Sequence, residues 1–181
     1  MKAFIRETLI VIILAAAIYG LLYFVIQGVP VVGSSMEPNL ESSGQRVLIC
    51  KCAYWFNIKP QRGDIITLHP PADWPNPKKL PFIKRIIGLP GETVEIKNGQ
   101  VFINGSDEPL NEPYIQMPFT YSMSLAEIPE DSYFVLGDNR NISEDSHLYG
   151  VIPRKNIIGK AWISYWPPSL WGAVANYRFA Y

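Results

Sequence analysis

Histidine and cysteine are scarce in this chain, with only two residues of each among 181. Cys50 and Cys52 are separated by one residue, a spacing at which a disulfide forms poorly, and no second cluster completes a zinc site. We therefore interpret both thiols as part of the core rather than as metal ligands or a redox pair. A Ser-His-Asp triad built on His69 or His147 is possible, but no pattern in the sequence indicates one.

An excess of charge of either sign is also missing. Sixteen Lys and Arg residues balance sixteen Asp and Glu residues, so the formal net charge is zero. Nucleic-acid-binding proteins usually carry a clear basic surplus, and nucleic acid is therefore not an expected partner. Proline and glycine are plentiful, at 16 and 13 residues, which favours many turns and short strands over long helices.

One stretch near the N-terminus contains no charged side chain at all. Residues 8–26 would form a helix of roughly 28 Å, which is long enough to cross the hydrocarbon core of a bilayer. Lys2 and Arg6 precede this stretch and the next basic residue is Arg46, so the positive-inside rule leaves the N-terminus in the cytoplasm. The alternative is a cleaved signal peptide, whose apolar region is usually shorter, at about 7–15 residues. We expect a retained, single-pass anchor.

The sequence predicts three parts: a cytoplasmic tail at 1–7, a transmembrane anchor at 8–27, and an extracytoplasmic domain at 28–181. Runs of branched and aromatic residues in the domain are typical of strands, and they lie at 46–51, 64–68, 82–87, 93–105, 132–137 and 156–166. Asn98-Gly99 predicts a hairpin inside a small insertion around 93–130. We expect a mainly β fold, either an antiparallel β-sandwich or a partly open barrel.

Two residues of the exported part form a candidate dyad. Ser35 lies just beyond the anchor in "VVGSSMEPNL", and a serine needs a neighbouring base to become a nucleophile. Lys84, in "PFIKRIIGLPGE", shares a predicted strand face with Phe82 and Ile86, so its pKa should fall. A neutral amine there could accept the proton of a serine. The alternative is a lysine that extends past its apolar neighbours to water.

A polar stretch, "LGDNRNISEDSHLYG" at 136–150, follows an apolar strand. By residue type it is either a solvated loop shaped by Asx turns or a loop that supports a site from behind with hydroxyl and carboxylate groups.

In their order and character, "GSSMEPNL", "RGDIITL", "FIKRIIGLPGE" and "GDNRNISEDSHLYGVIP" resemble the conserved boxes of bacterial-type signal peptidase I. The resemblance is to compact, single-anchor members, including those of cyanobacteria and plastids, and it covers the anchor and nearly all of the exported part. It implies a mostly β serine endopeptidase with Ser35 as nucleophile and Lys84 as general base. Neither a metal nor a cofactor is implied.

The same resemblance assigns supporting roles. The backbone N–H of Ser35 and the position of Gly33 would form the oxyanion hole, although Gly33 lacks the hydroxyl that some relatives carry there. Ser143 would orient Lys84, and Asp145 would be a buried acid that pairs with a basic side chain. His147 replaces an arginine that is common in the family.

The implied substrates are exported precursor proteins whose signal peptides end in a small-x-small motif such as Ala-x-Ala. The enzyme would lie in the cytoplasmic or thylakoid membrane, with its catalytic domain on the extracytoplasmic or lumenal side and the lipid bilayer as a partner. Val31, Met36 and Ile83 are candidates for the walls of shallow pockets, or else core residues. In a regular strand, Ile83 faces away from Lys84.

Two other functions remain open at this point. One is a related Ser/Lys processing protease with a specialised substrate, and the other is an anchored β-module that binds peptides without cleaving them. The Trp-rich segment 161–177 is compatible both with core packing and with contact to lipid headgroups.

Overall fold

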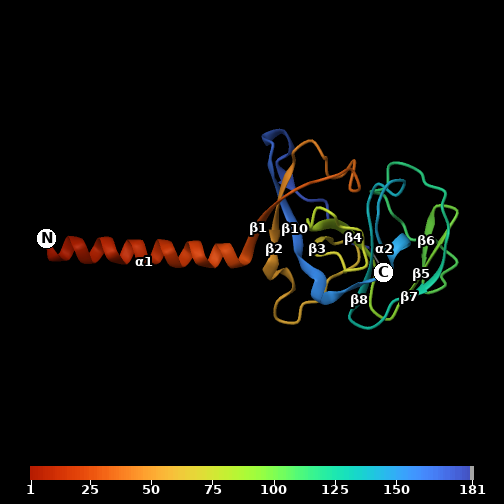
Figure 1. Ribbon diagram of the computed structural model, residues 1–181, viewed down its shortest axis with the longest axis horizontal. Coiled ribbons are helices and arrows are strands. Elements are labelled where there is room, and N and C mark those ends of the chain that lie inside the picture. The colour runs from red at the N-terminus through yellow and green to blue at the C-terminus, as the bar shows by residue number, and fades with distance from the viewer. Residues whose placement is uncertain (180–181) are drawn as a thin grey trace.

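The computed structural model describes residues 1–179 and contains one long helix that projects from a β-rich domain (Figure 1). This helix, α1, runs from Lys2 to Val25. Among the described residues, it is the one helix that is long and apolar enough to cross a membrane, over 22 residues that the domain leaves unburied. It ends two residues before the predicted boundary, because Ile26 and Gln27 already pair with a neighbouring strand.

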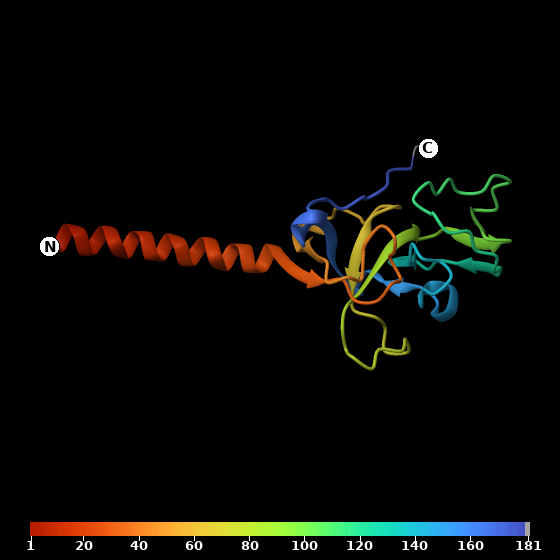
Figure 2. The ribbon, with the colours of Figure 1, turned by 90° about the horizontal axis from the view of Figure 1, so that it is seen from above.

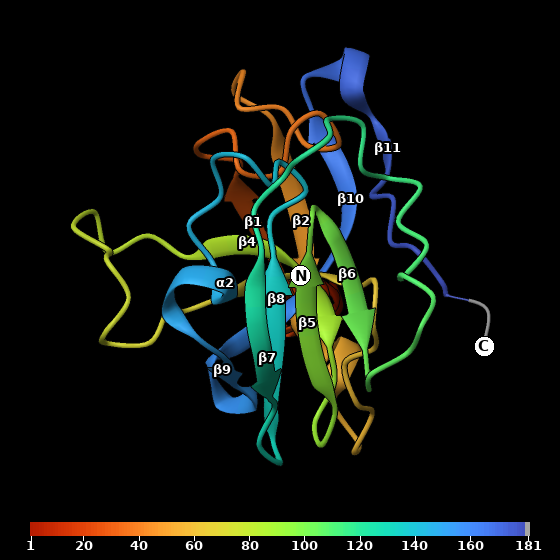
Figure 3. The same ribbon diagram turned by 90° about the vertical axis from the view of Figure 1, so that its right-hand side faces the viewer.

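The domain combines a large curled sheet with a small three-stranded sheet, as Figures 1 and 3 show. The large sheet has the order β1-β2-β10-β3-β4-β8-β9, with β11 beside β10, and the small sheet has the order β6-β5-β7. The strands of the large sheet are β1 (Ile26–Pro30), β2 (Arg46–Cys50), β3 (Ile65–Leu68), β4 (Phe82–Gly88), β8 (Ser132–Leu136), β9 (Ile152–Pro153), β10 (Ile157–Trp166) and β11 (Gly172–Ala173). Those of the small sheet are β5 (Thr93–Lys97), β6 (Gln100–Ile103) and β7 (Met123–Glu127).

Neighbouring strands are antiparallel throughout these two sheets, and the large sheet curls into a half-barrel. The predicted mainly β fold is therefore confirmed. The short helical turns are η1 (Lys51–Tyr54), α2 (Ser146–Tyr149), η2 (Arg154–Asn156) and η3 (Pro168–Leu170).

Strand β10 joins two parts of the large sheet that are distant in sequence. It lies between β2 and β3, antiparallel to both, with bulges in its pairing to each. The β1–β2 ribbon is thereby held beside β3, β4 and β8. Because Ser35 lies in the loop between β1 and β2 while Lys84 lies on β4, β10 brings the two halves of the predicted dyad into one sheet.

Strand β4 contributes to every apolar cluster of the domain. Ile83 packs with residues of β1, β2 and β10, Ile86 packs with residues of β3 and β8, and Ile87 packs with residues of the small sheet. A strand held on both faces in this way is rigid. Lys84 therefore projects from one of the most firmly packed elements of the fold.

Figure 2 shows the C-terminal segment lying along the domain after β11. The Tyr177 N–H donates to the carbonyl of Gly63 (3.2 Å), and the Arg85 guanidinium donates to the carbonyl of Ala175 (3.1 Å). Gly63 has a φ of +88°, and a Cβ at this position would lie 2.1 Å from the Tyr177 carbonyl oxygen. Only glycine fits here, so this segment is closely packed against the β-domain.

Candidate active site

The loop between β1 and β2 presents Ser35 at the surface while anchoring its backbone. The carbonyl of Ser35 accepts a hydrogen bond from the Asn139 N–H (3.0 Å), and the next side chain, Met36, is fully buried. The Ser35 side chain itself is half-buried. The apolar residue that follows the serine thus fixes the loop to the core and leaves the hydroxyl beside an open cavity.

Lys84 is buried, with only 3% of its surface exposed, and its Nζ donates a hydrogen bond to Ser143 Oγ at 2.9 Å. Burial lowers the pKa of Lys84 below its ordinary value, because an apolar environment disfavours the charged ammonium. The negative charges of Asp145, Glu144 and Asp138 act in the opposite direction but do not reverse this shift. Lys84 does not extend to water, contrary to the alternative considered from the sequence.

Ser35 and Lys84 line the same cavity, which has a volume of about 230 Å³. Gly33 and Ile83 are also on its wall, together with residues on either side of Ser143. Gly33 has a φ of +78°, and no heavy atom lies within 4 Å of where its Cβ would be. The backbone before Ser35 therefore faces open space into which a substrate carbonyl can enter.

Ile83 and Lys84 both reach this cavity although they alternate along β4. Pairing of β4 with β8 begins at Arg85, so in the described sheet the segment Phe82–Lys84 has β3 on one side and no β8 partner on the other. The two other predicted pocket residues lie elsewhere: Val31 and Met36 are buried in the same core cluster as Ile83, beneath the cavity. Their burial follows from the apolar packing of the β1–β2 loop.

Gly137 lies between Ser143 and the loop that carries Ser35. Its N–H donates to Asp145 Oδ2 (2.8 Å), which fixes the turn that carries Ser143. A Cβ at Gly137 would lie 2.2 Å from Ser143 Oγ and 2.4 Å from the Ser35 carbonyl oxygen. The absence of a side chain at Gly137 thus allows the loop that carries Ser35 to approach Ser143, the hydrogen-bond partner of Lys84.

Asp145 is fully buried behind Ser143, and its basic partner is a histidine. His147 Nδ1 lies 2.7 Å from Asp145 Oδ1, and the His147 backbone N–H donates to the same oxygen at 3.1 Å. Burial alone would raise the pKa of Asp145, but the contact with His147 and the nearby charge of Lys84 outweigh it and lower this pKa. The imidazole also stacks on Tyr121, with ring centroids 4.5 Å apart.

Sequence reasoning missed a second buried pair on the other face of β4. The Arg85 guanidinium binds Asp138 through two hydrogen bonds, Nε to Oδ1 (2.8 Å) and Nη2 to Oδ2 (2.7 Å), and it stacks over the Tyr114 ring. Asn39 Nδ2 donates to Asp138 Oδ2 at 2.9 Å. The position of Arg85 directly after Lys84 in an apolar strand was the available sign, because an arginine there must find an acid.

A half-buried serine and a buried lysine lie on the wall of one cavity, in a curled β-sheet that follows an apolar helix. This arrangement is the one expected of a serine peptidase with a lysine as base. Comparison with known proteins specifies the family. Residues 2–166 match the family described as "Signal peptidase, peptidase S26", and the chain belongs to this family.

Individual relatives agree with this assignment. The chain is 48% identical to signal peptidase I of Leptolyngbya laminosa over 151 residues, covering 82% of this chain and 72% of the relative. It is 41% identical to the probable signal peptidase I-1 of Synechocystis over 180 residues, covering 97% and 90%. It is 39% identical to thylakoidal processing peptidase 1 of Arabidopsis thaliana over 142 residues, covering 75% and 41%. The protein is thus a signal peptidase I, an endopeptidase of the Ser/Lys type that removes signal peptides from exported precursors.

Proposed function

We propose that Ser35 and Lys84 carry out this hydrolysis. The observation that supports the assignment most directly is that both line one cavity while Lys84 is buried and bound to Ser143. Neutral Lys84 takes the proton of Ser35 Oγ as this oxygen attacks the scissile carbonyl. The resulting ammonium then gives the proton to the leaving amine. A water then loses a proton to the same lysine and attacks the acyl-enzyme. The ester bond breaks, the lysine returns the proton to Ser35 Oγ, and the new carboxyl terminus of the signal peptide leaves.

The oxyanion that forms during each attack needs donors, and the backbone before Ser35 is suited to supply them. The N–H of Ser35 lies in the loop that the bond to Asn139 fixes, and the open space at Gly33 admits the substrate carbonyl. A donor of this kind typically contributes about 3–4 kcal/mol to transition-state stabilisation. Ser143 and Asp145 act behind the site by orienting Lys84 and the turn that carries Ser143.

The substrate would bind as an extended strand beside the free edge of Phe82–Lys84, opposite the segment that precedes Ser35. Side chains of an extended peptide alternate, so every second one would face the protein. Ile83 lies on the wall of this cavity, and its branched side chain would narrow the space left to the substrate, which would favour small residues at these positions. Cleavage after Ala-x-Ala motifs is the expected result.

Helix α1 would anchor the enzyme in the bilayer, with the N-terminus in the cytoplasm and the β-domain on the extracytoplasmic or lumenal side. The support is the length of the unburied apolar segment, Phe4–Val25, together with the basic residues that precede residue 8. Ser35 follows ten residues after Val25, so the nucleophile would lie near the membrane surface, where the cleavage site of a membrane-inserted precursor emerges.

The decisive experiment is cleavage of an Ala-x-Ala precursor by the full-length protein in detergent, for wild type, Ser35→Ala and Lys84→Ala. We expect both variants to fold and to lose activity. Ser34→Ala is the matched control, because Ser34 lies next to the nucleophile and should be dispensable. Cleavage by Lys84→Ala at the wild-type rate would exclude the dyad.

A further inference from the structure

Ser143 has two exposed neighbours that the peptidase mechanism does not use. Ser143 is buried and bound to Lys84, whereas Ile142 and Glu144 are exposed, with 55% of the Ile142 surface open to solvent. Both neighbours nevertheless lie on the wall of the catalytic cavity, together with Ser35 and Lys84. An apolar side chain and a carboxylate thus form part of the rim of the active site.

Glu144 gives this cavity its charge whenever Lys84 is neutral. Among the described residues of the cavity wall, Lys84 and Glu144 have the ionisable side chains, and no described side chain forms an ion pair with Glu144. Burial lowers the pKa of Lys84, and the charges of Asp145 and Glu144 act in the opposite direction, which places the Glu144 carboxylate near the amine. While the lysine serves as a base, the cavity therefore carries a negative charge that a cation would complement.

The turn that carries Ile142 and Glu144 has a fixed position relative to the nucleophile. The Asn139 carbonyl accepts hydrogen bonds from the N–H groups of Ile142 (3.4 Å) and Ser143 (3.1 Å). The Asn139 N–H donates to the Ser35 carbonyl (3.0 Å). A substrate group that binds to this turn therefore meets a preorganised surface and needs little rearrangement of the protein.

The leaving-group side of the substrate is the part that meets this turn. In the proposed mechanism the leaving amine takes its proton from Lys84, so it approaches the Nζ that Ser143 also contacts. The residue after the cut begins at the carbon attached to this nitrogen, whereas the residues before the cut lie along Phe82–Lys84. Its side chain therefore starts close to Ile142 and Glu144.

We propose that Ile142 and Glu144 select a basic residue, lysine or arginine, directly after the scissile bond. The aliphatic stem of such a side chain packs on Ile142, while its cationic end reaches the Glu144 carboxylate. An acidic residue at this position meets the same carboxylate and is disfavoured. The proposal deepens the proposed function and rests on it.

The test compares precursor peptides that differ only in the residue after an Ala-x-Ala motif, which is lysine, norleucine or glutamate. Norleucine has the stem of lysine without its ammonium, so the ratio of kcat/KM for lysine over norleucine isolates the effect of charge. With the full-length enzyme in detergent at low salt, we expect a ratio of about three to five, which is typical of a favourable exposed ion pair. Glutamate should fall below norleucine by a similar factor, and roughly 0.5 M salt should reduce both differences.

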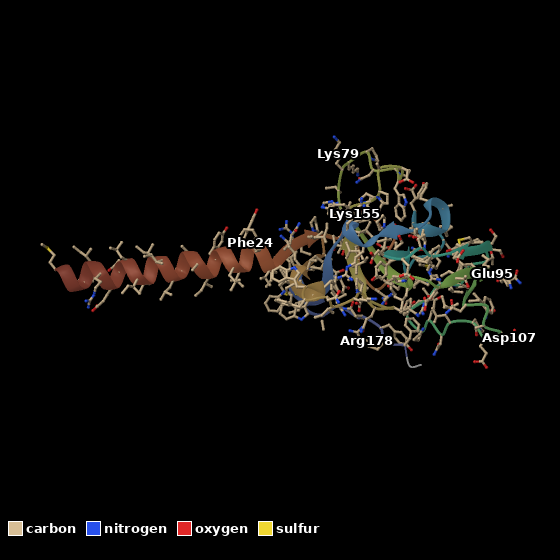
Figure 4. All side chains as sticks on the ribbon, turned by 90° about the horizontal axis from the view of Figure 1, so that it is seen from below. Phe24, Lys79, Glu95, Asp107, Lys155 and Arg178 are labelled. Atoms are coloured by element: carbon tan, nitrogen blue, oxygen red, sulfur yellow. The ribbon has the colours of Figure 1, made fainter. Side chains whose placement is uncertain are left out.

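Two variants separate the contributions of charge and apolar contact. Glu144→Gln should bring the lysine-to-norleucine ratio to about one. Ile142→Ala should lower kcat/KM about threefold for both peptides, because both have the same stem, and should keep the ratio. The matched control is Asp107→Asn, which removes a carboxylate from an exposed loop at the end of the domain away from α1 (Figure 4) and should keep the wild-type ratio.

The ratios are measured on the plateau of the pH–rate profile, where Lys84 is neutral. Loss of the Glu144 charge also lowers the pKa of Lys84, but on the plateau that change affects every peptide alike. A ratio of about one in wild type would mean that Glu144 acts on Lys84 alone. A ratio that Glu144→Gln leaves unchanged would mean that the basic side chain binds elsewhere. Either result would overturn the proposal.

Failure of the peptidase assignment would give a different result. If wild type cleaves none of the peptides, the proposed function is rejected. If wild type cleaves the norleucine peptide, Ser35→Ala does not, and the lysine-to-norleucine ratio is about one, the selection of basic residues is rejected while the peptidase assignment stands.

Discussion

Replacing Gly137 by alanine tests how closely the catalytic groups must approach. The new methyl group would lie 2.2 Å from Ser143 Oγ and 2.4 Å from the Ser35 carbonyl oxygen. Ordinary contacts begin at 3.4 Å, so each oxygen must move by at least about 1 Å. The Ser143 hydroxyl would then lose its 2.9 Å hydrogen bond to Lys84, and the nucleophile loop would shift at the same time.

A misplacement of about 1 Å in a catalytic array typically lowers the rate about 100-fold. We therefore expect kcat/KM of Gly137→Ala to fall by about two orders of magnitude on a precursor peptide. Overpacking of this kind usually destabilises a fold by about 1–3 kcal/mol, which lowers the melting temperature without preventing folding. Circular dichroism and thermal unfolding should therefore show a folded protein.

Two variants separate the steric effect from other causes. Gly20→Ala, in α1, adds the same methyl group where no heavy atom lies within 4 Å and should keep full activity. Ser143→Ala removes the hydrogen bond to Lys84 without moving Ser35, so its loss should be smaller than that of Gly137→Ala. A folded Gly137→Ala enzyme with kcat/KM close to that of wild type would refute the proposed geometry.

Three further predictions concern the buried charges. The protonated amine cannot act as a base, and burial lowers the pKa of Lys84, so kcat/KM should rise with pH and level off at a pH below the usual pKa of lysine. A pH–rate profile that stays flat to strongly acidic pH would exclude an amine base. Arg85→Met should lower the free energy of unfolding by about 3–5 kcal/mol in urea titrations, since it leaves Asp138 buried without its cation, and a loss below about 1 kcal/mol would contradict this. The charge of Asp145 raises the pKa of Lys84, so the arginine of His147→Arg, placed beside this carboxylate, should offset that effect and move the pH–rate profile to lower pH. A move to higher pH would disprove the coupling.

Much of the fold followed from the sequence because it rests on local patterns. Runs of branched and aromatic residues predicted β2, β3, β4, β8 and β10 within one or two residues of their observed bounds, and Asn98-Gly99 predicted the β5–β6 hairpin. Strands β1 and β7 were missed, as were the two-residue strands β9 and β11. The β1 residues continue the apolar run of α1, and β7 has only Met123, Leu125 and Ala126 as apolar residues. Both become strands through pairing with distant partners, which no local pattern records.

The candidate site also has residues that the sequence predicted and contacts that only the structure shows. Residue type and strand face indicated Ser35 and Lys84 as a candidate dyad, and the resemblance to a family added Ser143 and Asp145. The comparisons confirm membership of that family, while the individual roles stay predictions. The pairing of Asp145 with His147 depends on a turn that brings a residue two positions away onto the carboxylate.

The buried ion pairs behind the site could not be predicted from the sequence. Arg85, on β4, pairs with Asp138, which follows β8. Arg140 pairs with Glu112, which lies in the loop between β6 and β7. Composition shows that such charges exist but not which acid each one meets. Only the three-dimensional arrangement supplies those partners.

The place of β10 between β2 and β3 affects when the enzyme becomes active during its own biosynthesis. The serine leaves the ribosome early and the lysine follows about fifty residues later, yet the strand that unites their halves of the sheet emerges only at Ile157–Trp166. Long-range pairings of this kind form late and slowly. If Ser35 and Lys84 act as proposed, a nascent copy that still lacks β10 keeps these two residues apart, and it would not cleave neighbouring chains until most of its own chain has been synthesised.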